Sequence, residues 1–170
     1  MTIHCHVYLL AALMGAASCA QAQSARPDTQ VRSLTEEGPA RTLRAVLDGR
    51  AAVVMFWRSD CSPCLEEIAQ IEELRRAAQP MVLITVGLES PESLRERLKR
   101  MRIAPHLAWY SLEDPGEVLA AFGTVPRLPL TVAFDSAGET CARRRGVVTA
   151  TLIAEWARKC VQANALEEQR

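Results

Sequence analysis

The sequence lacks an excess of charge of either sign, because 20 Lys and Arg residues balance 20 Asp and Glu residues over 170 positions. Nucleic-acid binding needs a basic face that neutralises phosphates, so this balance argues against nucleic acid as a partner. The body of the chain also lacks the apolar run of about 20 residues that spans a bilayer. With 49% hydrophobic residues, the chain is too apolar to be disordered. We expect one globular domain for a chain of this length.

The N-terminal segment lacks charged side chains until Arg26. It contains an apolar run, Val7–Ala17, followed by the small-x-small sequence Ala20–Ala22. This arrangement is typical of a secretory signal peptide, so we predict that residues 1–22 are that signal and that the protein is exported to the periplasm. The alternative is a lipoprotein signal that anchors the exported protein through Cys19.

Histidine is scarce in the remainder of the chain. Without the predicted signal, the chain keeps His106 and the cysteines Cys61, Cys64, Cys141 and Cys160. Enzymes that need several histidine ligands or a histidine base are therefore disfavoured. Disulfides persist in the oxidising compartment that an exported protein reaches, so these cysteines are candidates for redox chemistry or structural bonds.

Hydrophobic patterning predicts an α/β fold. Two continuous apolar runs, 51–57 and 81–87, are typical of strands buried on both faces of a parallel sheet. Right-handed crossovers would make the early strands parallel. The expected strands are 31–35, 51–57, 81–87, 107–110, 130–134 and 139–145, and the expected helices are 42–47, 62–78, 90–102, 115–122 and 149–163. We expect a three-layer α/β/α sandwich with a mixed central sheet and a terminal β-hairpin. The domain would cover 41–163, with a leader over 23–40 and a polar tail over 164–170.

Cys61 and Cys64 carry the strongest chemical signal, because they stand where a buried strand is expected to turn into a helix. Cys61 precedes the first helical turn, whose unpaired N–H groups and positive dipole end stabilise a thiolate and lower the thiol pKa. Cys64 lies one turn further along, within reach of Cys61 and more shielded from solvent. The pattern predicts a nucleophile and a resolving thiol for thiol–disulfide exchange.

Three other functions use the same two cysteines. Half of a structural zinc site is disfavoured, because Cys141 and Cys160 lack the required spacing and His106 stands alone. The main alternative is a metallochaperone that holds Cu(I) between Cys61 and Cys64, since soft thiolates suit that ion. The remaining alternative is a binding module in which this pair is an inert structural disulfide.

The residues around the pair resemble a known family. The segment Phe56-Trp57-x-x-x-Cys61-x-Pro63-Cys64 is similar to the active site of the thioredoxin superfamily, and closest to its exported TlpA/ResA-like thiol–disulfide oxidoreductases. Further segments that resemble this branch are Glu66–Ile68, Val86–Ser90, Phe122–Pro129, Thr131 and Phe134-Asp135. The likeness extends from about Arg41 to Lys159.

The resemblance implies that the protein reduces or exchanges disulfides in client proteins, as in cytochrome c maturation. It implies a membrane-bound thiol reductase as electron donor and a monomer with no cofactor and no metal. It also implies a cis peptide before Pro129, beside which the client's backbone pairs as an added strand. Leu128, Pro129 and Trp57 are therefore the expected substrate-binding residues, with Trp57 packed beneath the active site. Whether the clients are reduced or oxidised in vivo is left open.

Glu89 is a candidate for proton transfer. It follows the expected strand 81–87, and Cys61 follows the neighbouring strand, so both lie where the C-terminal ends of parallel strands meet. A carboxylate there can exchange protons with Cys64, and the resemblance implies this catalytic role for Glu89. The alternative is a solvated loop carboxylate beside a helix N-terminus.

Two positions depart from the family's pattern. Asp60 stands directly before Cys61, where relatives usually have Trp, and an inward-pointing carboxylate would raise the Cys61 pKa. Met55 stands where thioredoxin has a buried Asp, so that proton relay is absent. These changes leave the redox poise and the choice of partner open.

Cys141 is expected on the last strand and Cys160 on the last helix, which should pack back across the sheet. In an oxidising compartment we expect a structural disulfide between them, and two buried thiols are the alternative.

Overall fold

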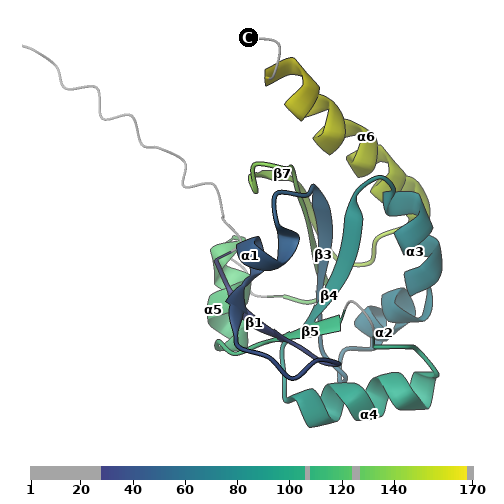
Figure 1. Ribbon diagram of the computed structural model, residues 1–170. Helices are drawn as coiled ribbons and strands as arrows, with labels where there is room; N and C mark the ends of the chain where they lie inside the picture. Colours follow the sequence, from purple (N-terminus) through teal and green to yellow (C-terminus); the bar gives the residue numbers. More distant parts are fainter. Residues whose placement is uncertain (1–27, 106–107, 124–126, 168–170) are drawn as a thin grey trace, which may run out of the picture.

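The computed structural model describes residues 28–105, 108–123 and 127–167 (Figure 1). The predicted signal 1–22, which includes Cys19, and the histidine His106 lie outside the described residues.

A mixed sheet forms the centre of the molecule, with the strand order β2-β1-β5-β4-β3-β6-β7. The strands are β1 (Gln30–Ser33), β2 (Arg41–Thr42), β3 (Ala52–Trp57), β4 (Val82–Gly87), β5 (Ala108–Ser111), β6 (Leu130–Phe134) and β7 (Thr140–Arg145). The helices are α1 (Leu43–Leu47), α2 (Ser62–Ala69), α3 (Ile71–Ala78), α4 (Pro91–Met101), α5 (Pro115–Ala121) and α6 (Ala150–Glu167). Strands β3, β4 and β5 are parallel, and β6 with β7 forms an antiparallel hairpin beside β3.

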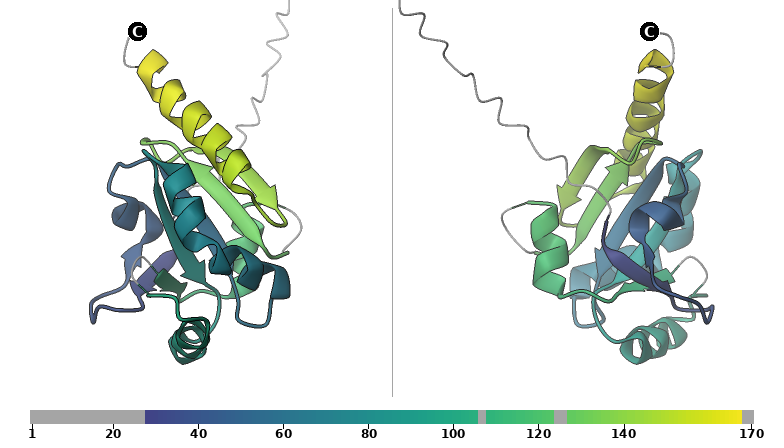
Figure 2. Two further views of the ribbon diagram at one scale, coloured as in Figure 1. Left: turned by 90° about the vertical axis from the view of Figure 1, so that its right-hand side faces the viewer. Right: turned by 60° about the vertical axis from the view of Figure 1, so that its left-hand side comes forward.

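Helices cover both faces of this sheet. Side chains along β3 alternate between the two faces, so each face presents apolar side chains to the helices that cover it. Val53 and Met55 pack among residues of α3 and α6. Val54 and Phe56 pack among residues of α1 and α5 on the other face. Figure 2 shows α3 and α6 side by side on one face of the sheet. The predicted three-layer α/β/α sandwich with a mixed sheet and a terminal hairpin is confirmed.

An aromatic cluster holds α5 against the sheet just before the loop that leads to β6. The rings of Phe56 and Phe122 lie 5.2 Å apart, and those of Phe122 and Phe134 lie 6.0 Å apart. All three side chains are fully buried, and each aromatic pair adds about 0.5–1.5 kcal/mol beyond its buried area. This packing fixes the start of the loop that returns to Leu128 and Pro129.

The structure differs from the sequence-based prediction at three elements. The expected helix 62–78 is divided at Gln70, whose backbone leaves the helical region (φ −102°, ψ 12°). Strand β1 is antiparallel to β5 and its Val31 is fully buried, so part of the expected leader 23–40 belongs to the sheet. Helix α6 continues to Glu167, past the end predicted at Ala163.

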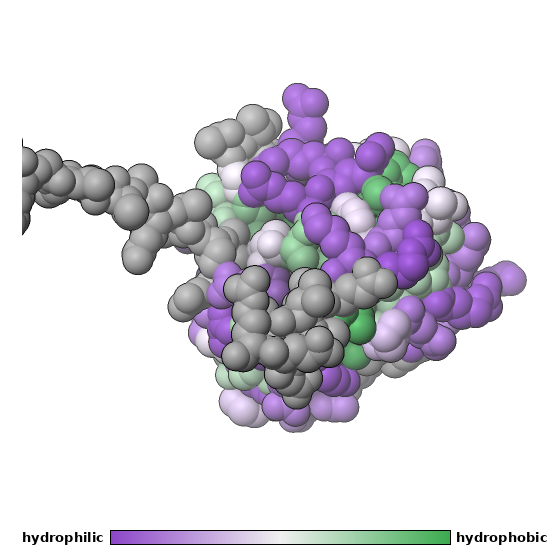
Figure 3. All heavy atoms as spheres, turned by 90° about the horizontal axis from the view of Figure 1, so that it is seen from above, coloured by the Kyte–Doolittle hydropathy of each residue, from purple (hydrophilic) through white to green (hydrophobic). Residues whose placement is uncertain are grey.

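Polar side chains dominate the surface where α6 and the hairpin emerge. Seen from above, this face is mostly hydrophilic and its apolar areas are small and separated (Figure 3). Within the described residues, no helix is both long enough and apolar enough to span a membrane.

Candidate active site

Cys61 stands at the start of α2, where the chain turns from β3 into the helix. Its backbone is extended (φ −98°, ψ 95°), and its Sγ accepts the N–H of Cys64 at 3.3 Å. Pro63 occupies the first turn, where a missing N–H costs no helical hydrogen bond. The Cys64 N–H and the positive end of α2 therefore stabilise a thiolate at this position once the cysteine is reduced.

Cys61 and Cys64 are joined by a disulfide that spans a single helical turn, with their Cα atoms 5.2 Å apart. Cys64 is 0% exposed, whereas Cys61 is only partly buried. Of the two cysteines, Cys61 is therefore the one that a partner can approach, and Cys64 is shielded. This arrangement suits a nucleophile and a resolving thiol.

Trp57 lies beneath the pair. It is 1% exposed and shares an apolar cluster with Cys64 and Ile68 of α2, and with Leu94 of α4. The expectation that Trp57 packs under the site agrees with this position. The prediction that Trp57 touches the substrate disagrees with this position, because the Trp57 side chain is buried by α2 and α4 and does not reach solvent.

The segment before β6 packs against the apolar cluster that contains Cys64. The Leu128–Pro129 peptide bond is cis, as expected. Leu128 is partly buried and packs against both the cluster that contains Cys64 and the core on the other face of the sheet. The carbonyl of Pro129 accepts the N–H of Gly146 at 2.9 Å, which ties this segment to the end of β7. The cysteine pair and Leu128, which are far apart in the sequence, thus pack at the same apolar cluster.

The loop before Cys61 contains a paired charge. The Nε and Nη2 atoms of Arg58 donate to the two carboxylate oxygens of Asp60 at 3.0 and 3.1 Å. These hydrogen bonds lower the pKa of Asp60. Its carboxylate is 67% exposed and its charge is balanced by Arg58. The negative charge beside Cys61 is therefore already partnered, which reduces its effect on a Cys61 thiolate.

Glu89 binds the same loop from the neighbouring strand end. The ends of β3 and β4 are adjacent, since Trp57 is paired with Gly87. The two carboxylate oxygens of Glu89 accept hydrogen bonds from Ser59, one from its N–H and one from its Oγ at 2.9 Å. Glu89 therefore holds the loop that presents Cys61, and it lies at the sheet edge that the sequence predicted for it.

Glu67 is a site residue that the sequence analysis did not single out. It lies one turn after Cys64 on the buried side of α2 and is 2% exposed. Its Oε1 accepts the N–H of Val148 at 2.7 Å. Burial raises the pKa of Glu67 to about 7, while the Val148 N–H and the charge of Arg144 act in the opposite direction. The signal available in the sequence was its spacing of three from Cys64, which places both side chains on one face of the helix.

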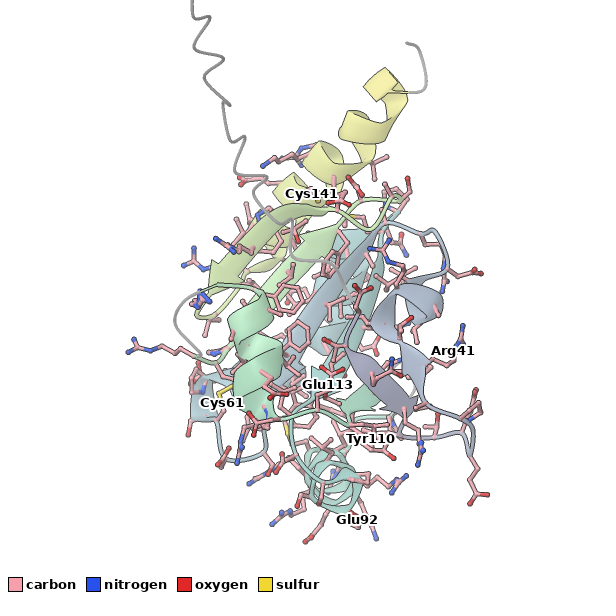
Figure 4. All side chains as sticks on the ribbon, turned by 90° about the vertical axis from the view of Figure 1, so that its left-hand side faces the viewer. Arg41, Cys61, Glu92, Tyr110, Glu113 and Cys141 are labelled. Atoms are coloured by element: carbon pink, nitrogen blue, oxygen red, sulfur yellow. A yellow bond between two sulfur atoms is a disulfide. The ribbon has the colours of Figure 1, made fainter. Side chains whose placement is uncertain are left out.

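Cys141 and Cys160 are also joined by a disulfide, with their Cα atoms 5.7 Å apart. The bond ties β7 to α6, and Cys160 is fully buried. Cys61 and Cys141 lie at well-separated places in the molecule (Figure 4). The second disulfide is therefore no part of the Cys61–Cys64 site.

Across residues 28–105, 108–123 and 127–167, no three His, Cys, Asp or Glu side chains are grouped so that they could hold a metal ion.

Comparison with known proteins agrees with this geometry. The sequence model of the Redoxin family matches residues 20–154. The chain is 23% identical over 154 residues to the sporulation thiol-disulfide oxidoreductase A of Bacillus subtilis (strain 168), an alignment that covers 89% of this chain and 93% of the relative.

Solved structures share the fold. MTB dsbF, in its mixed oxidized and reduced forms, superposes with a TM-score of 0.63 at 18% identity, covering 81% of this chain and 98% of that one. A secreted Mycobacterium tuberculosis disulfide oxidoreductase homologous to E. coli DsbE gives a TM-score of 0.59 at 15% identity, covering 78% and 96%.

Proposed function

The chain belongs to the Redoxin family and is a thioredoxin-like thiol–disulfide oxidoreductase, and on this premise we propose that it is exported and reduces disulfide bonds in client proteins. The observation that carries the proposal is the position of the Cys61–Cys64 disulfide at the start of α2, with one sulfur partly exposed and the other buried.

The reaction follows from these two positions. The thiolate of reduced Cys61 attacks one sulfur of a client disulfide, forms a mixed disulfide and releases the other client sulfur as a thiolate. The Cys64 thiolate then attacks Cys61 Sγ, closes the Cys61–Cys64 bond and releases the second client sulfur. Two electrons pass to the client, and the enzyme is left in the disulfide form. A membrane-bound thiol reductase would return two electrons to the pair.

Cys64 must lose its proton before it attacks, and we propose a carboxylate as the acceptor. Glu89, the candidate from the sequence, is supported by its place at the sheet edge, although both of its oxygens are engaged by Ser59. Glu67 is supported by its position one turn from Cys64 and by a pKa of about 7, which suits a group that exchanges protons near neutral pH. Replacing each carboxylate by Gln separates the two, because only the acceptor's loss slows the resolving step.

Leu128 and Pro129 form the proposed docking site for the client backbone. Pro129 has no N–H, but the segment packs through Leu128 against the cluster that contains Cys64 and can receive an extended client segment as an added strand. Trp57 supports the pair from below and is not part of this contact.

Export and the identity of the clients are further parts of the proposal. The predicted signal 1–22 supports export, and so does the likeness to a secreted disulfide oxidoreductase of Mycobacterium tuberculosis. The resemblance to TlpA/ResA-like proteins supports apocytochrome c as a client. Such a client presents a pair of cysteines that must be reduced before haem attachment.

The test is insulin reduction by the purified, prereduced protein and its cysteine variants. We expect Cys61→Ala to abolish turnover, and Cys64→Ala to accumulate a mixed disulfide with the client that mass spectrometry detects. The double variant Cys141→Ala/Cys160→Ala is the matched control and should retain activity. Tight stoichiometric Cu(I) binding without reductase activity would instead favour the metallochaperone, and a pair that stays closed under mild reduction would favour a structural disulfide.

The reduction potential of the Cys61–Cys64 pair decides the direction of the reaction. A value near that of thioredoxin, about −270 mV, supports the proposed reductant, and a value near −120 mV indicates an oxidant.

A further inference from the structure

Glu67 connects the active-site helix to the turn between β7 and α6. Its Oε1 accepts the N–H of Val148, a residue that is 4% exposed and packs in the core beside α6. The hydrogen bond joins residues that are 81 positions apart in the sequence. The carboxyl is therefore held by a group outside its own helix, and whatever positions this turn also positions the carboxyl.

Arg144 holds the other end of the same peptide group. Its Nε donates to the carbonyl of Val147 at 2.9 Å, and the carbonyl of Val147 and the N–H of Val148 belong to one planar amide. The guanidinium and the carboxylate therefore bind opposite ends of a single peptide unit. A hydrogen bond to the carbonyl polarises the amide and strengthens its N–H as a donor.

We propose that Arg144 is a positioning residue that acts on Glu67 through the Val147–Val148 peptide, aiming its N–H at the carboxylate and favouring the ionised form. The inference rests on the proposed function only in one respect, which is the use of Glu67 as proton acceptor for Cys64.

The balance of influences on Glu67 shows why such a residue matters. Burial favours the protonated form, and a protonated carboxyl cannot take a proton from Cys64. The Val148 N–H and the charge of Arg144 oppose the effect of burial. Arg144 thus supports the charge state that proton acceptance requires.

Direct titration of the Glu67 carboxyl by NMR in the oxidised protein tests the inference. Glu67→Gln identifies the signal. Arg144→Gln removes the charge and should raise the titration midpoint of Glu67 by roughly half a pH unit, as expected for one partly screened charge. Arg144→Lys retains the charge and should give a smaller rise.

Arg143→Gln is the matched control. It lies on the same strand and loses the same charge, but it faces the other side of the sheet, where Arg143 Nη1 donates to the Phe122 carbonyl at 2.7 Å. The midpoint of Glu67 should not move in this variant. An unchanged midpoint in Arg144→Gln, or an equal rise in Arg143→Gln, overturns the inference.

The functional measurement is the pH dependence of insulin reduction. Arg144→Gln should move the acidic limb of the profile to higher pH by the same amount as the NMR midpoint, and it should add nothing when Glu67 is already Gln. A moved NMR midpoint in a protein that reduces no disulfide contradicts the proposed function and supports the positioning role. An unmoved midpoint in an active enzyme contradicts the positioning role alone.

Discussion

Two acidic side chains near the Cys61–Cys64 pair are held in different ways. Glu89 is partly exposed and uses both oxygens to hold Ser59. Glu67 is buried and receives one backbone N–H. A buried carboxyl with a raised pKa binds its proton more tightly in the folded than in the unfolded state, so its titration affects folding stability.

This difference predicts a pH-dependent effect of Glu67→Gln on stability. The folded-state pKa of about 7 exceeds the ordinary glutamate value of about 4.3. The contribution of protonated Glu67 to the free energy of unfolding is therefore fully present below about pH 4. It is lost as the pH rises through 7. Relative to pH 4, wild type should lose up to about 3 kcal/mol by pH 8, and Glu67→Gln should lose much less.

Urea denaturation of the oxidised proteins at pH 4, 6 and 8 measures this loss, because the disulfides then contribute no titrating thiols. Parallel curves for wild type and Glu67→Gln would contradict a buried, titrating carboxyl at this position.

The reacting residues could be predicted from the sequence, and the buried acid could not. Cys61 and Cys64 stand out because an apolar strand, a CxxC and a proline at the first helical turn occur in succession. Glu67 follows Glu66 in a helix with many charges, and only its register relative to Cys64 separates the buried glutamate from the exposed one. Its partner, Val148, is an apolar residue whose backbone makes the contact, so no side-chain pattern marks it.

At the scale of elements, the strands were predicted closely and the break between α2 and α3 was missed. Strand β6 has the predicted bounds, and β3 and β4 each begin one residue after theirs, because continuous apolar runs mark buried strands. Neither proline nor glycine occurs at Gln70, so the usual signal for a helix break is absent. Strand β1 was expected to be parallel, and its antiparallel pairing with β5 depends on a contact that no local pattern encodes.

The disulfide between β7 and α6 predicts a stability effect. Cys141 and Cys160 are 19 residues apart, and closing a loop of this size restricts the unfolded chain by about 3 kcal/mol. Cys141→Ala/Cys160→Ala should lower the free energy of unfolding by that amount in urea denaturation. Cys61→Ala/Cys64→Ala, which opens a loop of three residues, should cost less, and an equal or larger loss there would contradict this account.

At the scale of the whole molecule, the signal predicted over residues 1–22 predicts that the chain is processed. Expressed in full in a Gram-negative host, the chain should be recovered from the periplasm with Gln23 at its N-terminus, as intact-mass measurement would show. Cys19→Ser should leave this product unchanged. An acylated N-terminal Cys19, lost in Cys19→Ser, would show that the lipoprotein alternative is correct, and retention of residues 1–22 would contradict both.

The separation of the two disulfides affects how the molecule tolerates its own turnover. Each catalytic half-cycle opens or closes a bond that spans one helical turn, which restricts the unfolded chain less than the longer loop does. The longer loop, closed at the other end of the sheet, is untouched by this cycle. The contribution of the Cys141–Cys160 bond to stability is therefore retained whether the Cys61–Cys64 pair is oxidised or reduced.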